Sequence, residues 1–126
     1  MKETNIQRLI MMALSKSGAR IFRNNVGKAY AGKAIKLTNG DVVIKNPYLI
    51  KFGLCVGSSD VIGWTPVTIT PDMVGQKVAI FTAIEVKKPK GRVSPEQKQF
   101  IERLTSDGGL AGVARSEHEA VEIIRL

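Results

Sequence analysis

The stretch KVAIFTAIEVKK, Lys77–Lys88, decides the fold expected for this chain. Successive side chains of a strand point to opposite faces, and here both faces are apolar until Glu85 and Lys87 appear on one of them. A strand that is apolar on both faces is typical of the middle of a sheet. The stretch therefore predicts a central strand whose C-terminal end carries an acid and a base on the same face.

The residues that follow predict a helix and a second strand. Ser94, Pro95 and Gln97 have the spacing of an N-cap, a proline at the first helical position and a capping-box glutamine, and Gly108-Gly109 can end the helix. Residues 110–115 predict a buried strand and residues 116–124 a short last helix. A strand, helix, strand crossover most simply gives a parallel pair.

The N-terminal half adds one helix and several extended segments. Apolar residues at helical spacing over residues 6–14 predict a helix, with Thr4 and Gln7 as its capping box and Gly18 as its end. Residues 19–23 predict a short strand. Glycines and lysines in residues 24–33 indicate an exposed basic loop.

A hairpin and two less regular extended segments come next. The flanks 34–38 and 41–45 enclose Asn39-Gly40, a dipeptide that suits a tight turn. Residues 49–56 and 61–70 are expected to be extended, although glycine and proline interrupt them. The whole order predicts an α/β fold, with a mixed central β-sheet flanked by helices.

Composition is that of an ordinary globular protein. The 126 residues are 44% hydrophobic and 24% charged, which fits one domain over residues 1–126 and favours neither a disordered nor a membrane protein.

No apolar run reaches the roughly 18 residues of a membrane span, and the first residues lack a signal-peptide layout, so a cytoplasmic location is expected. The single cysteine, Cys55, suits a reducing compartment and is expected in the core.

The charge favours a polyanionic partner. Nineteen Lys and Arg residues against eleven Asp and Glu leave a net charge of +8, with a pI near 9.9. Such a surplus attracts nucleic acid and speeds the encounter with it. Solubility alone is an equally good explanation of the total, so the distribution of the charges has to decide.

One acidic residue turns an ordinary ion pair into a candidate site. Glu85 and Lys87 alone would be a solvated pair where the strand leaves the core. Asp60, however, stands in GSSDVIG, residues 57–63, where a carboxylate among apolar residues and glycines needs a partner. A shared Mg²⁺ or Mn²⁺ would supply it, and a lysine beside such a metal can hold the attacking water and neutralise a phosphorane.

Four segments together resemble a known family. Residues 57–63, 83–87 (AIEVK), 94–100 (SPEQKQF) and 23–27 (RNNVG) are similar to the virus-type replication-repair nucleases, the VRR-NUC branch of the PD-(D/E)XK superfamily. The likeness spans nearly the whole chain. It implies a restriction-endonuclease-like core of α-β-β-β-α-β type and a metal-dependent nuclease. One departure is Ser59 before Asp60, where relatives often have proline.

The resemblance also implies roles for individual residues. Asp60 and Glu85 match the metal ligands, with the backbone carbonyl of Val86 completing the set, and Lys87 matches the catalytic lysine. Gln97 matches a glutamine that faces the site, and capping the helix is compatible with that role. Glu3 resembles an acidic residue that related resolvases carry on their first helix.

Basic and polar residues flank these motifs in the sequence and could line a track for a nucleic-acid backbone: Arg23, Asn24, Lys28, Lys33, Lys88, Lys90 and Arg92. Phosphates carry no base information, so such contacts would be salt-dependent and insensitive to sequence. A merely solvated basic face is the alternative. The single histidine, His118, is expected at the surface.

The function expected from these observations is a structure-selective DNA nuclease that uses Mg²⁺ or Mn²⁺. Small stand-alone relatives resemble homodimeric Holliday-junction resolvases, which implies branched DNA and a homodimer, in a bacterial cell or a phage-infected host. The main alternative is a non-catalytic basic nucleic-acid-binding protein on the same fold. A restriction enzyme or an RNA nuclease is a third hypothesis.

Overall fold

The computed structural model describes residues 2–125, which form two compact units. The first unit comprises the chain up to Ser17 together with Ile21–Ile62, and the second comprises Gly18–Arg20 and the chain from Gly63 onward. The single domain expected over residues 1–126 stays a prediction.

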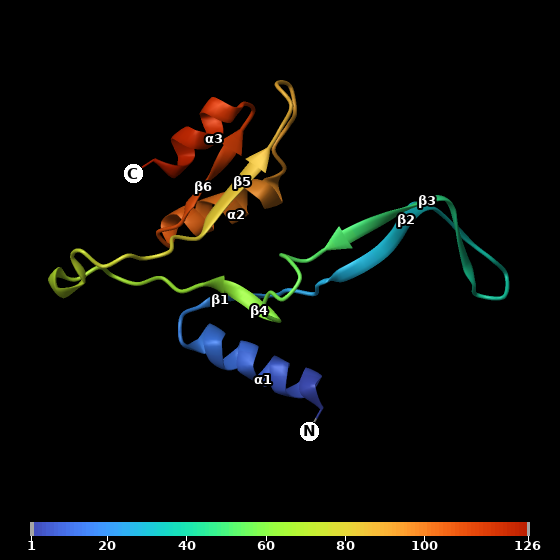
Figure 1. The fold of residues 1–126 in the computed structure, drawn as a ribbon, viewed down its shortest axis with the longest axis horizontal. Coiled ribbons are helices and arrows are strands. Elements are labelled where there is room, and N and C mark those ends of the chain that lie inside the picture. The colour runs from blue at the N-terminus through green and yellow to red at the C-terminus, as the bar shows by residue number, and fades with distance from the viewer. Residues whose placement is uncertain (1, 126) are drawn as a thin grey trace. The chain divides into compact units, whose positions relative to one another are not determined.

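The described residues form a helix, a run of five strands interrupted by a 3-10 turn, and then a helix, a strand and a last helix (Figure 1). None of these helices is long and apolar enough to cross a membrane. In chain order the elements are α1 (Glu3–Lys16), β1 (Arg20–Arg23), β2 (Gly27–Lys36), β3 (Val42–Phe52), β4 (Val61–Trp64), a 3-10 turn (Pro71–Met73), β5 (Thr82–Val86), α2 (Pro95–Ser106), β6 (Leu110–Ala114) and α3 (Glu117–Ile124).

The predicted α/β class is confirmed, with both parallel and antiparallel strand pairs. Within residues 2–125 the strands form three two-stranded sheets, β1 with β4, β2 with β3 and β5 with β6. The expected central strand is therefore shorter than residues 77–88 and pairs only with β6 in the part of the chain described. Apolar residues on both faces indicate that both faces of a strand are covered, but they do not indicate how many strands pair with it.

The C-terminal crossover is as the sequence predicts. β5 and β6 are parallel, with Thr82 opposite Leu110 and Val86 opposite Ala114. The Ser94 side chain accepts a hydrogen bond from the Gln97 backbone N–H at 3.1 Å, and the Gln97 side chain accepts one from the Ser94 N–H at 2.9 Å. This capping box fixes the start of α2 at Pro95, and the helix then packs against β6.

The second unit has an apolar core around α2. Leu104 is completely buried, and Trp64 is 9% exposed. The Trp64 ring lies 5.1 Å from the ring of Phe81 and 5.7 Å from that of Phe100, nearly edge-on to the latter. Its indole N–H donates to Asp107 Oδ2 at 3.0 Å, so the polar end of a buried aromatic residue is satisfied.

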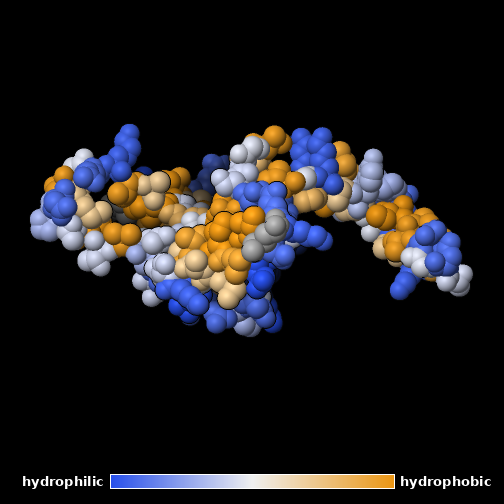
Figure 2. All heavy atoms as spheres, turned by 90° about the horizontal axis from the view of Figure 1, so that it is seen from below, coloured by the Kyte–Doolittle hydropathy of each residue, from blue (hydrophilic) through white to orange (hydrophobic). Residues whose placement is uncertain are grey.

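In the first unit, α1 confirms the predicted first helix but not its capping box. The helix already begins at Glu3, with Lys2 at the N-cap, so Thr4 lies inside the first turn where its hydroxyl cannot act as a cap. No residue of α1 is buried. Figure 2 shows apolar side chains gathered over this helix; those more than a third exposed include Ile6, Leu9, Ile10 and Met12.

The prediction of a basic loop over residues 24–33 is wrong, because residues 27–36 form β2 and pair antiparallel with β3. The glycines there allow close approach rather than a turn. A Cβ on Gly27 would lie 2.7 Å from the Phe52 ring, and one on Gly32 would lie 2.6 Å from the Lys45 carbonyl oxygen. The register shifts at this second glycine, which is typical of a β-bulge.

The predicted turn at Asn39-Gly40 is confirmed. The Leu37 N–H donates to the Asp41 carbonyl at 2.7 Å, and the Asp41 N–H donates to the Asn39 side chain at 3.0 Å. Gly40 has a φ of +93°, whereas Asn39 is not among the residues with positive φ. One left-handed residue after the turn is the pattern of a three-residue hairpin loop.

The expected burial of Cys55 is wrong. Cys55 is an exposed free cysteine in the loop between β3 and β4. Its apolar neighbours Leu54 and Val56 are 66% and 92% exposed. The apolar character of this stretch favoured a core position for Cys55 in an extended segment, but β3 ends at Phe52 and the next residues turn along the surface.

Candidate active site

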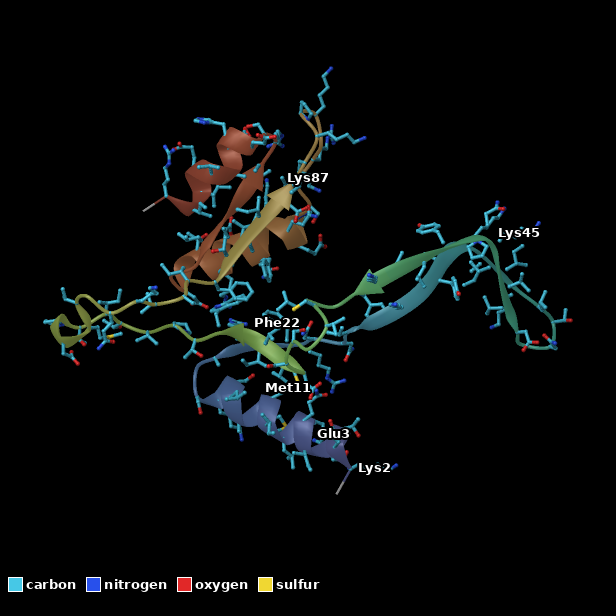
Figure 3. All side chains as sticks on the ribbon, viewed as in Figure 1. Lys2, Glu3, Met11, Phe22, Lys45 and Lys87 are labelled. Carbon is cyan, nitrogen blue, oxygen red and sulfur yellow. The ribbon has the colours of Figure 1, made fainter. Side chains whose placement is uncertain are left out.

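Glu85 and Lys87 lie together at the C-terminal end of β5, as the alternation of the strand predicts. Lys87 Nζ is 3.5 Å from Glu85 Oε1, and the two side chains are 20% and 32% exposed. The Lys87 N–H donates to the Ala114 carbonyl at 3.1 Å, which extends the ladder one residue beyond the strand. The backbone around Lys87 is therefore held by β6 (Figure 3).

Gln97 connects the start of α2 to the same carboxylate. Its Nε2 donates to Glu85 Oε1 at 2.9 Å, while its Oε1 accepts from the Ser94 N–H. One side chain thus caps the helix and holds the acid, because the amide offers a donor and an acceptor at opposite ends. Val86, whose carbonyl is a predicted ligand, lies between Glu85 and Lys87, and its side chain is 76% exposed.

The donors around Glu85 leave one of its oxygens for a cation. Within the described residues, the hydrogen bond from Gln97 and the ion pair with Lys87 both involve Oε1. Oε2 is then available, and a carboxylate oxygen is the ligand that Mg²⁺ and Mn²⁺ prefer. Glu85 therefore fits a divalent metal ion by its chemistry.

A small cavity of about 240 Å³ adjoins this carboxylate. Residues from β5 and the first turns of α2 line it: Ala83, Ile84, Glu85, Glu96, Gln97, Phe100 and Ile101. The lining is mostly apolar, with Glu85, Glu96 and Gln97 as its polar residues.

The basic residues after β5 stand on an anchored loop. Lys88, Lys90 and Arg92 are all exposed. The Gly91 N–H donates to the Lys88 carbonyl at 2.9 Å, and the Arg115 guanidinium donates to the Gly91 carbonyl at 2.9 Å. The sequence pattern did not single out Arg115, because its only signal is its position directly after the last strand.

Asp60 is held in the first unit by a polar cluster built on Asn24. The Asn24 N–H donates to the Asp60 carbonyl at 2.8 Å, just before β4. The Asn24 amide donates to Ser58 Oγ at 2.7 Å and to the Ser59 carbonyl at 2.9 Å, and its oxygen accepts from the Leu54 N–H at 2.8 Å. The Asn24 side chain therefore holds the loop before Asp60 at three residues, Leu54, Ser58 and Ser59.

These hydrogen bonds give Asn24 a structural role that the sequence did not suggest. Asn24 is only 8% exposed, and it is the buried polar residue of the described chain. The expectation was contact with DNA, but its amide hydrogens and its oxygen bond within the protein. The signal that could have revealed this is the pair Ser58-Ser59, which offers short polar partners directly before the acid.

The remaining candidates of the first unit are exposed. Glu3 opens α1, where a negative charge also suits the helix dipole (Figure 3). Arg23 ends β1, and Lys28 and Lys33 lie on β2. Asp60 and Glu85 belong to different units, and each is placed only within its own.

Residues 2–125 contain no group of three or more His, Cys, Asp or Glu side chains that could hold a metal ion. The predicted ligand set does not depend on such a group. It consists of two carboxylates and one backbone carbonyl, and only the further candidate Glu3 would make it a group of three acids.

Comparison with family models identifies the chain. The model described as VRR-NUC domain matches residues 1–118, a range that includes every candidate residue named above. A search of curated proteins and a search of solved structures gave no match. VRR-NUC domains are PD-(D/E)XK-type nuclease domains that generally act on DNA, and domains of this type generally use divalent metals. The chain belongs to the VRR-NUC nuclease family.

Proposed function

We propose that this protein is an Mg²⁺- or Mn²⁺-dependent, structure-selective nuclease that hydrolyses phosphodiester bonds in branched DNA such as Holliday junctions. The observation that carries the proposal is the Glu85 carboxylate, which Gln97 and Lys87 hold at the end of β5 in a chain of a nuclease family. The geometry suits hydrolysis because an acid with one free oxygen stands beside an ammonium group.

The metal ligands in this proposal are Asp60, Glu85 and the carbonyl of Val86, with Glu3 as a further candidate. A bound Mg²⁺ or Mn²⁺ supplies Lewis acidity toward the phosphate and lowers the pKa of water. The protein's part is to present hard oxygen donors in a fixed orientation. Gln97 fixes Glu85, and Asn24 fixes the loop that carries Asp60.

Lys87 is the proposed catalytic residue. Its ammonium group is a compact positive charge 3.5 Å from Glu85 Oε1. There it can hold the attacking water and offset the charge that builds on the phosphorane. Gln97 is a positioning residue, because it acts on the substrate through Glu85.

Binding of DNA is assigned to exposed basic residues of both units: Arg23, Lys28, Lys33, Lys88, Lys90 and Arg92. Contacts with phosphates position the nucleic acid without reading bases, which favours selection by shape. Homodimerisation is part of the proposal because each chain has one candidate site and a symmetric four-way junction needs two cuts.

The test is a cleavage assay on four-way junctions, flaps and linear single- and double-stranded DNA, with Mg²⁺, Mn²⁺ or EDTA. We expect metal-dependent cleavage that is fastest on branched DNA. The variant Glu85→Gln should lose at least about 100-fold in rate, as expected for removal of an electrostatic group at the reacting centre. Glu102→Gln, an exposed change on α2, is the matched control and should cleave like the wild type.

Two results would contradict the proposal. One is full activity of Glu85→Gln. The other is wild-type protein that binds DNA equally well with and without EDTA and cleaves none of the substrates, which would identify a non-catalytic basic nucleic-acid-binding protein on the same fold.

A further inference from the structure

The hairpin of β2 and β3 places lysine opposite lysine twice. Its register pairs Lys28 with Lys51 and Lys33 with Lys45. Residues directly opposite each other share a face of the ladder, with their Cβ atoms about 4.5–5.5 Å apart. Like charges at that separation destabilise a hairpin, so the pattern needs an explanation beyond folding.

No acidic side chain of the described residues forms an ion pair with these lysines. The ion pairs found in residues 2–125 are Lys87 with Glu85 and Arg125 with Glu122, and neither involves the hairpin. Between residues 27 and 52 there are five lysines and one acid, Asp41, so this segment carries +4 of the chain's +8. Asp41 bonds to Asn39 in the turn.

The paired lysines, Lys28, Lys33, Lys45 and Lys51, are all exposed, and Figure 3 labels Lys45 on the hairpin. Solubility would need exposed lysines but not lysines placed opposite each other. A polyanion lying along the hairpin would turn both repulsive pairs into binding sites, because each pair can neutralise closely spaced phosphates.

We propose that the paired lysines bind the phosphate backbone of DNA and that the hairpin is a DNA-binding arm. Lys51 and Lys45 thereby join Lys28 and Lys33 as contact residues. Five residues of a strand span about 16 Å, a length over which duplex DNA carries roughly nine charges. The proposal rests on the proposed function only for the choice of DNA as the polyanion.

The test measures binding in EDTA, so that it does not depend on cleavage. Fluorescence anisotropy with a labelled duplex and a labelled four-way junction compares the wild type with Lys28→Gln/Lys51→Gln over roughly 50 to 200 mM salt. We expect weaker binding and a salt slope smaller by about 1.8, because two phosphate contacts are lost. Lys77→Gln/Lys98→Gln removes the same charge from exposed positions outside the hairpin and should change the slope much less.

Thermal unfolding without DNA separates binding from folding. Relief of the lysine repulsion should leave the melting temperature of Lys28→Gln/Lys51→Gln unchanged or higher. Lys28→Arg/Lys51→Arg, which keeps the charge, should keep the affinity of the wild type.

Two results would overturn the proposal. One is that Lys28→Gln/Lys51→Gln and its control Lys77→Gln/Lys98→Gln have the same DNA affinity and the same salt slope. The other is that Lys28→Arg/Lys51→Arg, which keeps the charge, loses binding as well. Cleavage by the wild type in Mg²⁺, measured separately, decides the proposed function. A protein that cleaves but whose hairpin variant binds like the control would contradict only the DNA-binding arm.

Discussion

The two units position their candidate site residues by different physical means. In the second unit, Glu85 stands on a strand whose ladder, helix cap and apolar core around Leu104 fix its backbone. In the first unit, Asp60 follows a loop whose contacts run through the buried amide of Asn24. A strand ladder, a helix cap and a packed core therefore fix the backbone that carries one carboxylate, while a single buried side chain fixes the loop beside the other.

We therefore expect the two units to tolerate different mutations. Apolar packing loses free energy in proportion to the volume removed. A buried amide loses it through partners left without a hydrogen bond. The two carboxylates should thus respond to different substitutions.

The largest loss is expected from Leu104→Ala. Leu104 is completely buried and touches the backbone at Gly109 so closely that a Cβ there would lie 2.3 Å from its Cδ1. Removing it should lower the free energy of unfolding by about 3–5 kcal/mol, because the cavity can collapse only in part. Urea denaturation measures this, and a loss below about 1 kcal/mol would show that the core around α2 is not close-packed.

The next loss is expected from Asn24→Ala, which should lower the free energy of unfolding by about 2–3 kcal/mol because three side-chain hydrogen bonds disappear. Hydrogen exchange should speed up at the Leu54 amide, whose acceptor is the Asn24 oxygen. Asn25→Ala changes an exposed neighbour and serves as the control.

The same variant distinguishes the two roles considered for Asn24. A role in holding the loop predicts slower metal-dependent cleavage with unchanged DNA affinity in EDTA. If the affinity fell while stability and exchange stayed as in the wild type, Asn24 would be a DNA contact after all.

A smaller effect is expected from Gln97→Glu, which separates helix capping from the contact with Glu85. Glutamate also completes a capping box, so the helix start should survive. Its carboxylate cannot donate to Glu85 Oε1, and cleavage should fall about 10–100-fold, as for other groups that orient a metal ligand. Metal binding measured by calorimetry on the same variant should weaken.

Ser94→Ala is the matched control for that experiment. It should cost about 1 kcal/mol of stability through the lost cap, since its hydroxyl accepts from the Gln97 N–H. Cleavage by the folded protein should be unchanged. Equal cleavage losses in the two variants would mean that Gln97 acts only through the helix start.

Local signals explain what could be predicted from the sequence. The start of α2 and the contact of Glu85 with Lys87 follow from residues a few positions apart. The parallel pairing of β5 and β6 follows from the strand, helix, strand order, whose elements each carry a local signal. The strand β2 was missed because glycine usually marks a turn, whereas Gly27 makes room for the ring of Phe52, 25 residues away in the sequence. The Asn24 cluster was missed for the same reason, because its partners lie more than 29 residues downstream.

The smallest effect is expected at the tip of the hairpin, from Gly40→Ala. The φ of +93° disfavours any residue with a Cβ, but no atom lies within 4 Å of the position a Cβ would take. Strain alone should therefore cost about 1–2 kcal/mol at most, the order of one left-handed residue. DNA affinity in EDTA should fall only slightly, because the register that pairs the lysines is also fixed by the ladder toward Phe52. A collapse of binding in this variant, measured beside Lys28→Gln/Lys51→Gln, would mean that the turn rather than the ladder sets that register.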